Sequence, residues 1–316
     1  MNSVRTMIVI ATLSGHLAAS AQVFVDLKIP STLLLEMEPA VVTVTLRNQT
    51  GDSFALGGTN QTNQLHLDIQ RGSGSFVPPT GEPIVPDEVL VPARGTRTFE
   101  LNMPQLYQVR HSGPYAIAAR LALGEDRYVS ERFLFDVVPG FEIARMEART
   151  RGTEPRRMVF MLKVLARDRE EQLFIRFDEP QSGLCHGVYS LGSVIRMFEP
   201  RMMVDHDNRV HVLHQSAPQR FTHSVFELDG APVSVKYYGG RVSDARMEMD
   251  EDGVVEILGV VPYQGDPSIA PLRSAARVWA PAPPPPPPPR RRPPSSDTPR
   301  APPRADPVAA PEPSGN

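Results

Sequence analysis

Apolar and polar residues alternate with a period of two along much of the stretch from residue 22 to residue 139. Val42, Val44 and Leu46 alternate with polar side chains, and residues 65–69 repeat the pattern. This period is typical of strands that bury one face and expose the other. Glycine and proline separate the alternating runs, and no run has the longer period of an amphipathic helix. The pattern therefore predicts a β-sandwich of about seven short strands over residues 22–139.

A second pattern recurs between residues 140 and 280, where the chain stays rich in alternating apolar residues. The stretch RMMVDHDNRVHVLHQS at 201–216 returns 45 residues later as RMEMDEDGVVEILGVV at 246–261, with six identical positions among sixteen. Each copy predicts a hairpin, and two further strands follow the first copy before the second begins. We therefore expect a second β domain over residues 140–280, built from blade-like four-stranded repeats of about 45 residues.

Acidic residues mark the turn of each repeated hairpin. They are Asp205 and Asp207, followed by Asn208, in the first copy, and Asp250 and Asp252, followed by Gly253, in the second. The last turn position often requires a positive φ, which glycine adopts freely and asparagine tolerates. Aspartate side chains also accept hydrogen bonds from turn amides. A calcium loop is the alternative, but calcium takes about six or more oxygen ligands. We therefore interpret these residues as structural turn residues.

Two segments of the first domain are similar to immunoglobulin-like domains. LYQVRHSGPYAIAARL, residues 106–121, resembles their tyrosine corner, and VTVTLRNQTGDSFAL, residues 42–56, resembles an early strand and turn of bacterial members. The resemblance implies a sandwich in which the Tyr115 hydroxyl bonds back to the preceding loop. The repeats of residues 140–280 resemble secreted β-propeller repeats with an Asp-x-x-Gly turn, although two complete units and a partial one do not close a ring. The immunoglobulin-like resemblance implies a fold and names no function.

Four histidines lie in and after the first copy of the repeat: His206, His211, His214 and His223. Imidazole is a common zinc ligand, so these residues are the candidates for a metal or pH-sensing site. His211 and His214 stand three residues apart in a predicted strand, however, and such residues face opposite sides. The second copy keeps the shared pattern of the repeat but contains no histidine. We therefore expect no metal ion and no cofactor, and interpret the histidines as ordinary polar side chains.

Signatures of the common enzyme classes are absent from the sequence. It contains no His-Glu-x-x-His, no Gly-x-Ser-x-Gly and no phosphate-binding loop. The sequence therefore indicates a non-catalytic protein. A hydrolase that uses carboxylates or histidines of residues 140–280 stays open as an alternative, because catalytic carboxylates can lie far apart in sequence. A metal-binding module is the other alternative.

The first 21 residues predict an export signal. Arg5 precedes an apolar run over residues 7–17, and Ala-Ser-Ala at 19–21 has the small-x-small form of a cleavage site. The apolar run is shorter than the roughly 20 residues that span a bilayer, and no later run is long enough, so we expect no membrane span. Cys185 is the only cysteine, which excludes an intrachain disulfide. We expect a bacterial protein of the periplasm or the extracellular space.

The final segment, residues 281–316, is dominated by proline and contains no aromatic residue. Such a composition cannot bury enough apolar surface to fold, so we expect a disordered tail that acts as a spacer. A docking peptide is the alternative, with the arginines at 290–292 against an anionic partner. Of the net charge of −3, the signal contributes +1 and the tail +2, which leaves −6 on residues 22–280. This acidic body argues against nucleic acid as a partner.

These observations together predict an exported, non-catalytic binding or scaffold protein whose ligand the sequence does not name. Its expected class is all-β, with an immunoglobulin-like β-sandwich, a second β domain and a disordered proline- and arginine-rich tail. A protein or a cell-surface component is the expected partner, bound through edge strands and loops or through the tail.

Overall fold

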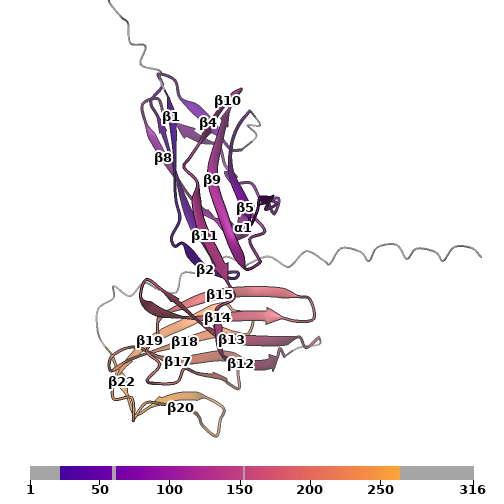
Figure 1. Ribbon diagram of the computed structural model, residues 1–316. Coiled ribbons are helices and arrows are strands. Elements are labelled where there is room, and N and C mark those ends of the chain that lie inside the picture. The colour runs from indigo at the N-terminus through magenta and orange to yellow at the C-terminus, as the bar shows by residue number, and fades with distance from the viewer. Residues whose placement is uncertain (1–21, 59–61, 152–153, 264–316) are drawn as a thin grey trace, which may run out of the picture. The chain divides into compact units, whose positions relative to one another are not determined.

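The computed structural model describes residues 22–58, 62–151 and 154–263. The predicted export signal, residues 1–21, and the proline-rich tail, residues 281–316, lie outside the described residues. Within the described ranges the chain forms 22 strands and one four-residue helix, α1 (Met103–Leu106), so the all-β class is confirmed (Figure 1). In the same ranges no helix is long and apolar enough to cross a bilayer.

Two sheets and a small strand pair make up the first part of the chain. One sheet has the order β1 (Val23–Lys28), β3 (Val41–Asn48), β8 (Thr96–Asn102). The other has the order β2 (Leu33–Leu35), β11 (Phe133–Val138), β9 (Gly113–Leu123), β5 (Asn63–Arg71), β6 (Ser75–Phe76), with β10 (Asp126–Val129) paired to β9. The strand pair joins β4 (Phe54–Leu56) to β7 (Val89–Val91).

The core of this first part lies between its two sheets. Val42, Val44 and Leu46 of β3 are fully buried, and Leu65 and Leu67 of β5 belong to the same apolar cluster. Full burial of one such side chain stabilises the fold by about 1.5–3 kcal/mol. The period of two therefore identified the inward face of both strands.

Tyr115 fixes the loop that leads into β9. Its hydroxyl donates a 2.7 Å hydrogen bond to the carbonyl of His111, four residues earlier. Its ring stacks on Phe135 of β11 at a centroid distance of 5.3 Å. One side chain thus ties a turn to the core, which is the role that the sequence resemblance implies for it. Membership of an immunoglobulin-like family stays a prediction.

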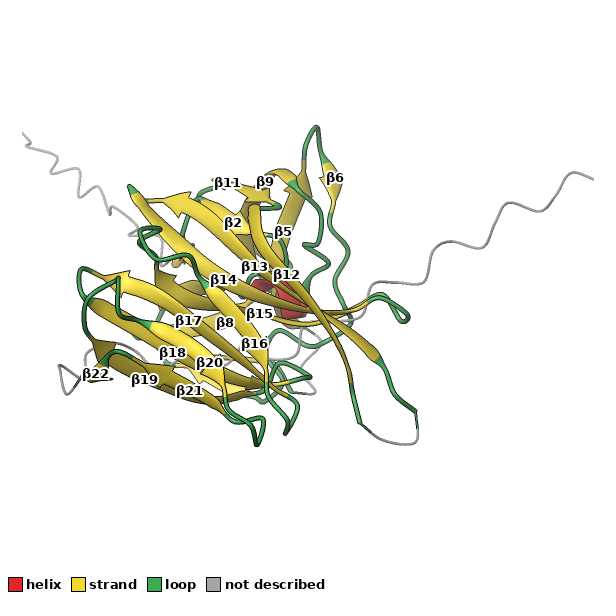
Figure 2. Cartoon of the chain, turned by 90° about the horizontal axis from the view of Figure 1, so that it is seen from below, coloured by secondary structure: helices red, strands yellow, loops and turns green. Residues whose placement is uncertain are grey.

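Two four-stranded meanders and a hairpin make up the second part of the chain (Figures 1 and 2). The first meander is β12 (Phe141–Arg149), β13 (Arg157–Arg167), β14 (Glu170–Glu179), β15 (Leu184–Ser193). The second is β16 (Arg201–Val204), β17 (Arg209–Ala217), β18 (Arg220–Glu227), β19 (Pro232–Gly239), with β22 (Val261–Pro262) paired to β19. The hairpin is β20 (Arg246–Met249) and β21 (Val255–Leu258).

The central strands of the second meander, β17 and β18, are buried on both faces. On one face Val212 and Phe226 share a cluster with Phe177 of the first meander. On the other face Leu213 and Phe221 pack against the β20–β21 hairpin. β17 and β18 are therefore buried along almost their whole length instead of at every second residue. The described strands form stacked layers and no closed barrel, and their relation to propeller blades stays a prediction.

Candidate functional site

The two repeated turn segments, residues 205–208 and 250–253, both form hairpin turns. Asn208 and Gly253 occupy the last turn position with φ of 65° and 79°. Oδ1 of Asp205 accepts a hydrogen bond from the backbone N–H four residues later at 2.7 Å, and Oδ1 of Asp250 does the same at 2.7 Å. The middle aspartates of the two turns are exposed: Asp207 and Asp252. The aspartates that begin the turns therefore stabilise the backbone bend.

The two turns also touch each other, which the sequence did not indicate. The backbone N–H of His206 donates to the carbonyl of Gly253 at 2.9 Å. A Cβ atom at Gly253 would lie 2.6 Å from Cβ of His206, closer than such atoms approach in proteins. Glycine is therefore required in the second turn both for its positive φ and for this contact.

The histidines of β17 lie on opposite faces of the strand. His211 shares a face with Leu213, which packs on the β20–β21 hairpin. His214 shares a face with Val212, which packs on the first meander. This placement follows from the three-residue spacing. The two side chains therefore cannot ligate one ion together.

A buried chain of three polar side chains links β17 and β18. Nε2 of His211 lies 2.9 Å from Oδ2 of Asp205, and Nδ1 of His211 lies 3.0 Å from Nε2 of His223. The two imidazole rings stack at a centroid distance of 5.2 Å. The histidines are 7% and 5% exposed. Little of either ring is therefore open to a substrate in solvent.

These two hydrogen bonds require one particular tautomer of each histidine. His211 donates from Nε2 to the Asp205 carboxylate and accepts at Nδ1 from His223. Nδ1 of His223 then carries a lone pair without a hydrogen-bond partner among the described residues. Burial, together with the neighbouring His211 and Lys236, lowers the pKa of His223 to about 4. Both effects keep the ring neutral at pH 7.

His214 is buried without a conventional hydrogen bond. Its side chain has no exposed surface, and neither ring nitrogen has a partner of ordinary geometry among the described residues. Burial lowers its pKa to about 4, although the nearby backbone of Leu191 and Ser193 favours the protonated form slightly. His214 is therefore a neutral core residue at pH 7.

The histidines do not form a common metal centre. Within the described ranges, no group of three or more His, Cys, Asp or Glu side chains is arranged to hold a metal ion. His206 is exposed at its turn, His214 faces the first meander, and His211 and His223 bond to each other. Their arrangement fits a structural role better than a ligand set.

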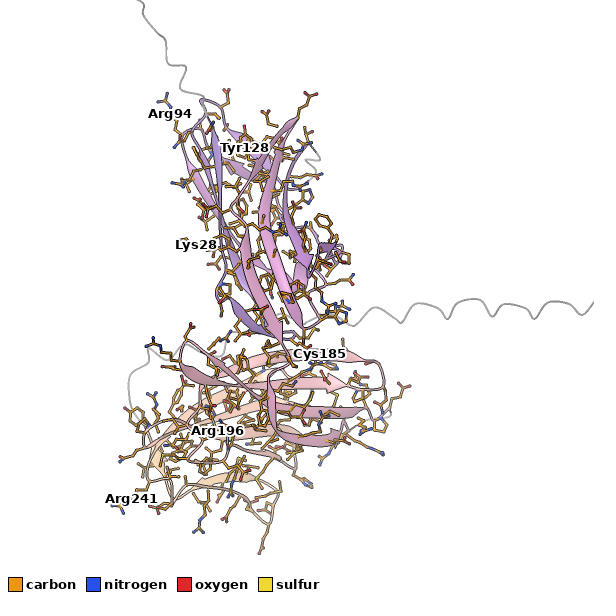
Figure 3. All side chains as sticks on the ribbon, in the orientation of Figure 1. Lys28, Arg94, Tyr128, Cys185, Arg196 and Arg241 are labelled. Atoms are coloured by element: carbon orange, nitrogen blue, oxygen red, sulfur yellow. The ribbon has the colours of Figure 1, made fainter. Side chains whose placement is uncertain are left out.

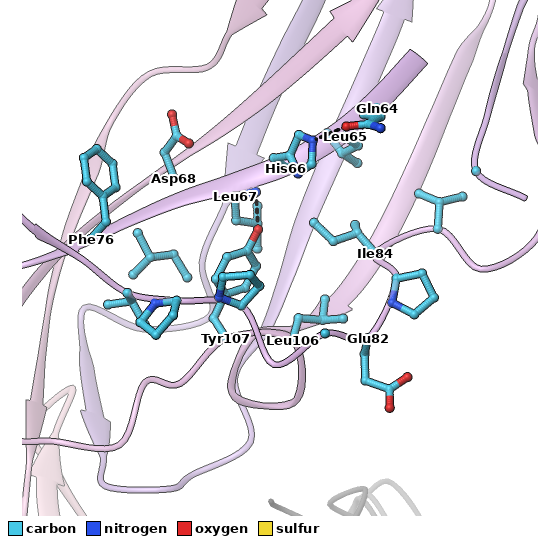
Figure 4. Close-up of a pocket in the computed structure, with 18 of the residues that line it drawn as sticks. Gln64, Leu65, His66, Leu67, Asp68, Phe76, Glu82, Ile84, Leu106 and Tyr107 are labelled. Atoms are coloured by element: carbon cyan, nitrogen blue, oxygen red, sulfur yellow. Dashed lines mark hydrogen bonds between the residues drawn. The ribbon is translucent and has the colours of Figure 1, made fainter. Parts of the chain in front are cut away.

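A groove of about 710 Å³ lies in the first part of the chain, beside the free edge of β5. The segment 76–85 forms its opposite wall, and Leu106 and Tyr107 lie between the two (Figure 4). Its volume is in the range of small-molecule and peptide sites, about 300–1,000 Å³. The groove therefore has the size of a binding site.

Backbone groups of β5 point into this groove. The N–H of Leu67 donates to the Tyr107 hydroxyl at 2.9 Å, and the carbonyl of Ile69 accepts from Val77 at 2.9 Å, so both face away from β9. Alternate residues of a strand present their backbone groups to the same side. The N–H and C=O of Leu65 therefore face the groove as well. Neither has a hydrogen-bond partner in the described part of the chain.

Polar and aromatic side chains line the rim of the groove. Nε2 of His66 contacts Oε1 of Gln64 at 2.8 Å. Asp68 forms an ion pair with Arg120, whereas the exposed Glu82 forms no ion pair with any described residue. The ring of Phe76 is 65% exposed, and it lines one end of the groove. Apolar walls with a few polar groups are typical of ligand sites.

The hydroxyl of Tyr107 is the best-defined polar group at the base of the groove. Burial raises the pKa of this phenol, the Leu67 N–H opposes the shift, and the Asp68 charge adds to it. The group therefore stays protonated at neutral pH. A hydroxyl that accepts from Leu67 still has its own hydrogen to donate.

Sequence reasoning did not single out any residue of this groove. Leu65 and Leu67 belong to the alternating run that predicted a strand, and the prolines after Phe76 predicted only a break. Whether a strand lies at a sheet edge depends on the order of strands in space, which the pattern along one strand does not contain. The glycines and prolines of the segment 76–86 were the one local sign of an irregular wall.

Comparisons with known proteins do not place the chain in a family. No protein-family model matches it, and no curated protein matches it. Among solved structures, Spo0M, a sporulation control protein from Bacillus subtilis, is 11% identical, with a TM-score of 0.25 over 51% of this chain and 80% of that chain. A DUF4784 family protein from Bacteroides caccae ATCC 43185 is 7% identical, with a TM-score of 0.18 over 75% of this chain and 84% of that chain. These likenesses are too low to carry an argument about fold or function.

Proposed function

We propose that the chain is an exported, non-catalytic binding protein whose ligand site is the groove beside β5. The groove itself carries this proposal: a volume of about 710 Å³, apolar walls and unpaired backbone groups of Leu65 in one place. Backbone groups that face a groove without partners favour a ligand that supplies them.

The hydrolase alternative has less support. General acid–base catalysis requires a titratable group within hydrogen-bond reach of the substrate. The best-connected titratable groups, Asp205, His211 and His223, form a chain whose rings are buried between the second meander and the hairpin. The metal-binding alternative rested on the same histidines, which lie on different faces and in a turn.

Export is proposed from residues 1–21, and the lone thiol is compatible with it. Cys185 lies on β15 (Figure 3). Its side chain is buried, and burial raises the pKa of its thiol to about 12. A thiol in this state is a poor nucleophile and does not form mixed disulfides readily. The folded chain would therefore tolerate the oxidising conditions of the periplasm or the extracellular space.

Two probe sets test the binding function on the purified full chain. The first is a library of small-molecule fragments, and the second is a phage-displayed library of linear peptides. Binders from either set are compared on the wild type, on Phe76→Ala and on Phe141→Ala. Phe141 is the matched control, because its ring is 67% exposed and lies on β12, outside the groove.

The proposal predicts binders whose affinity falls at least about tenfold with Phe76→Ala, equivalent to about 1.4 kcal/mol. The same binders should keep their affinity for Phe141→Ala. If neither library yields a binder that depends on Phe76, the groove is not the ligand site and the proposed function is wrong.

A further inference from the structure

Part of the edge of β5 that faces away from β9 is not covered by another strand of its sheet. β6 pairs only with Gln70 and Arg71 of β5. One further bond, from the Val77 N–H to the Ile69 carbonyl, covers the next position of this edge. Tyr107 then occupies the N–H of Leu67 with its side chain. From Leu65 to the carbonyl of Leu67 the edge faces the groove. Unpaired strand edges are the usual template for adding a strand from another chain.

We propose that the groove takes an extended, basic peptide segment of another protein as an added strand on β5. This inference rests on the proposed function and names the class of its ligand. In strand addition the backbone hydrogen bonds supply affinity, and pockets for alternate side chains supply specificity.

The backbone of β5 offers a defined set of bonds to such a segment. The N–H and C=O of Leu65 form one donor–acceptor pair, and the carbonyl of Leu67 adds an acceptor. The N–H of Leu67 is already bonded to the Tyr107 hydroxyl and cannot bond a ligand. The hydroxyl still has its own hydrogen to donate, so it can bond a peptide carbonyl in place of the Leu67 N–H. Figure 4 shows Tyr107 below Leu67, with Ile84 and Glu82 across the groove from β5. A strand inserted here would therefore find partners for its inward backbone groups.

The walls of the groove define the side chains that a ligand needs. Successive residues of an extended peptide point to opposite sides. Phe76 and the half-buried Ile84 offer apolar contact. Glu82 is an exposed carboxylate without an ion pair in the described part of the chain. The charge of Asp68, in contrast, is compensated by its ion pair with Arg120. The lining therefore keeps one uncompensated negative charge, which favours lysine or arginine in the ligand.

Backbone methylation of a peptide separates strand addition from side-chain binding. The probe is the peptide Arg-Val-Thr-Val-Thr-Val-Arg, amidated at its carboxyl end and with a fluorescent label on its amino terminus, titrated with the full chain by anisotropy. Two variants of the probe carry N-methyl groups on alternate amides, one set on even positions and the other on odd positions. In an added strand only one of these sets faces β5.

Strand addition predicts that one methylated probe loses affinity by about tenfold or more, whereas the other binds like the parent peptide. Glu82→Gln should weaken binding by a few-fold and reduce its salt dependence, while the control Glu251→Gln, on an exposed turn, should change neither. Phe76→Ala should weaken the parent peptide, and Phe141→Ala should not.

The outcomes distinguish the two levels of the proposal. If both methylated probes bind as the parent does, or if the parent shows no Phe76-dependent binding, strand addition is wrong. The groove remains the ligand site in that case as long as other probes still depend on Phe76. If no probe of any kind depends on Phe76, the inference and the proposed function fail together.

Discussion

Acid should destabilise this protein through histidines that it buries in neutral form. Burial lowers the pKa of His214 from its ordinary value of 6.5 to about 4, and the pKa of His223 also falls to about 4. Between pH 6.5 and pH 4 the unfolded chain therefore binds more protons than the folded chain. Stability must rise with pH across this window and fall as the pH is lowered through it.

The size of the effect follows from the two pKa values. For one histidine that moves from 6.5 in the unfolded chain to 4 in the folded chain, lowering the pH from 7 to 5 costs about 2 kcal/mol. His214 and His223 together then cost about 4 kcal/mol. This loss is large beside the roughly 5–15 kcal/mol that holds a typical native protein together.

Urea denaturation of the full chain at pH 7 and pH 5, followed by far-ultraviolet circular dichroism, measures this loss. His214→Gln cannot titrate, so it should lose about 2 kcal/mol less than the wild type between the two pH values. His111→Gln replaces an exposed histidine in the same way and is the matched control for the substitution. An equal loss in the wild type and in His214→Gln would refute the reasoning, because His214 would then not be held neutral by the fold.

Three further predictions concern packing. Gly253→Ala should destabilise the chain by at least about 1 kcal/mol in the same denaturation assay, because it meets both a positive φ and Cβ of His206, whereas Asn208→Gly should be nearly neutral. Tyr115→Phe should cost about 1 kcal/mol by removing the hydrogen bond to the His111 carbonyl, and an unchanged urea midpoint would contradict that role. The thiol of Cys185 should not react with a coloured disulfide reagent at pH 8 until urea unfolds the chain; rapid reaction of the folded protein would show that it is not buried.

The alternation of apolar residues predicted the β structure of the first part of the chain, but the predicted number of about seven strands was too low, because several of the eleven strands there, such as β6 (Ser75–Phe76), are too short to show the pattern. Strands β1, β3 and β5 each bury one face, as with Val42, Val44 and Leu46, so each of these strands contains the information needed to find its inward side. The same reasoning also placed His211 and His214 on opposite faces of β17.

Alternation was less informative in the second meander. β17 and β18 lie between two layers, so both of their faces are buried, and polar side chains such as His214 and Ser224 lie in the interior. The repeat at 201–216 and 246–261 was visible in the sequence, but the contact of His206 with Gly253 depends on how the two hairpins stack.

The candidate sites show the same limit more clearly. His211 and His223 lie on neighbouring strands, and their 3.0 Å contact depends on the register of β17 against β18. The groove depends on β5 having no full-length neighbour on one side, which is a property of strand order. Local sequence patterns specify the faces of a strand but not its position in a sheet.

Amide hydrogen exchange at Leu65, measured by NMR on the full chain with and without the Arg-Val-Thr-Val-Thr-Val-Arg peptide, tests the central claim most directly. Binding as an added strand predicts that exchange of the Leu65 amide slows by at least about tenfold, because a peptide carbonyl covers it. The amide of Gln64 faces β9 and should not change. Unchanged exchange at Leu65 with the peptide at saturating concentration would contradict the account.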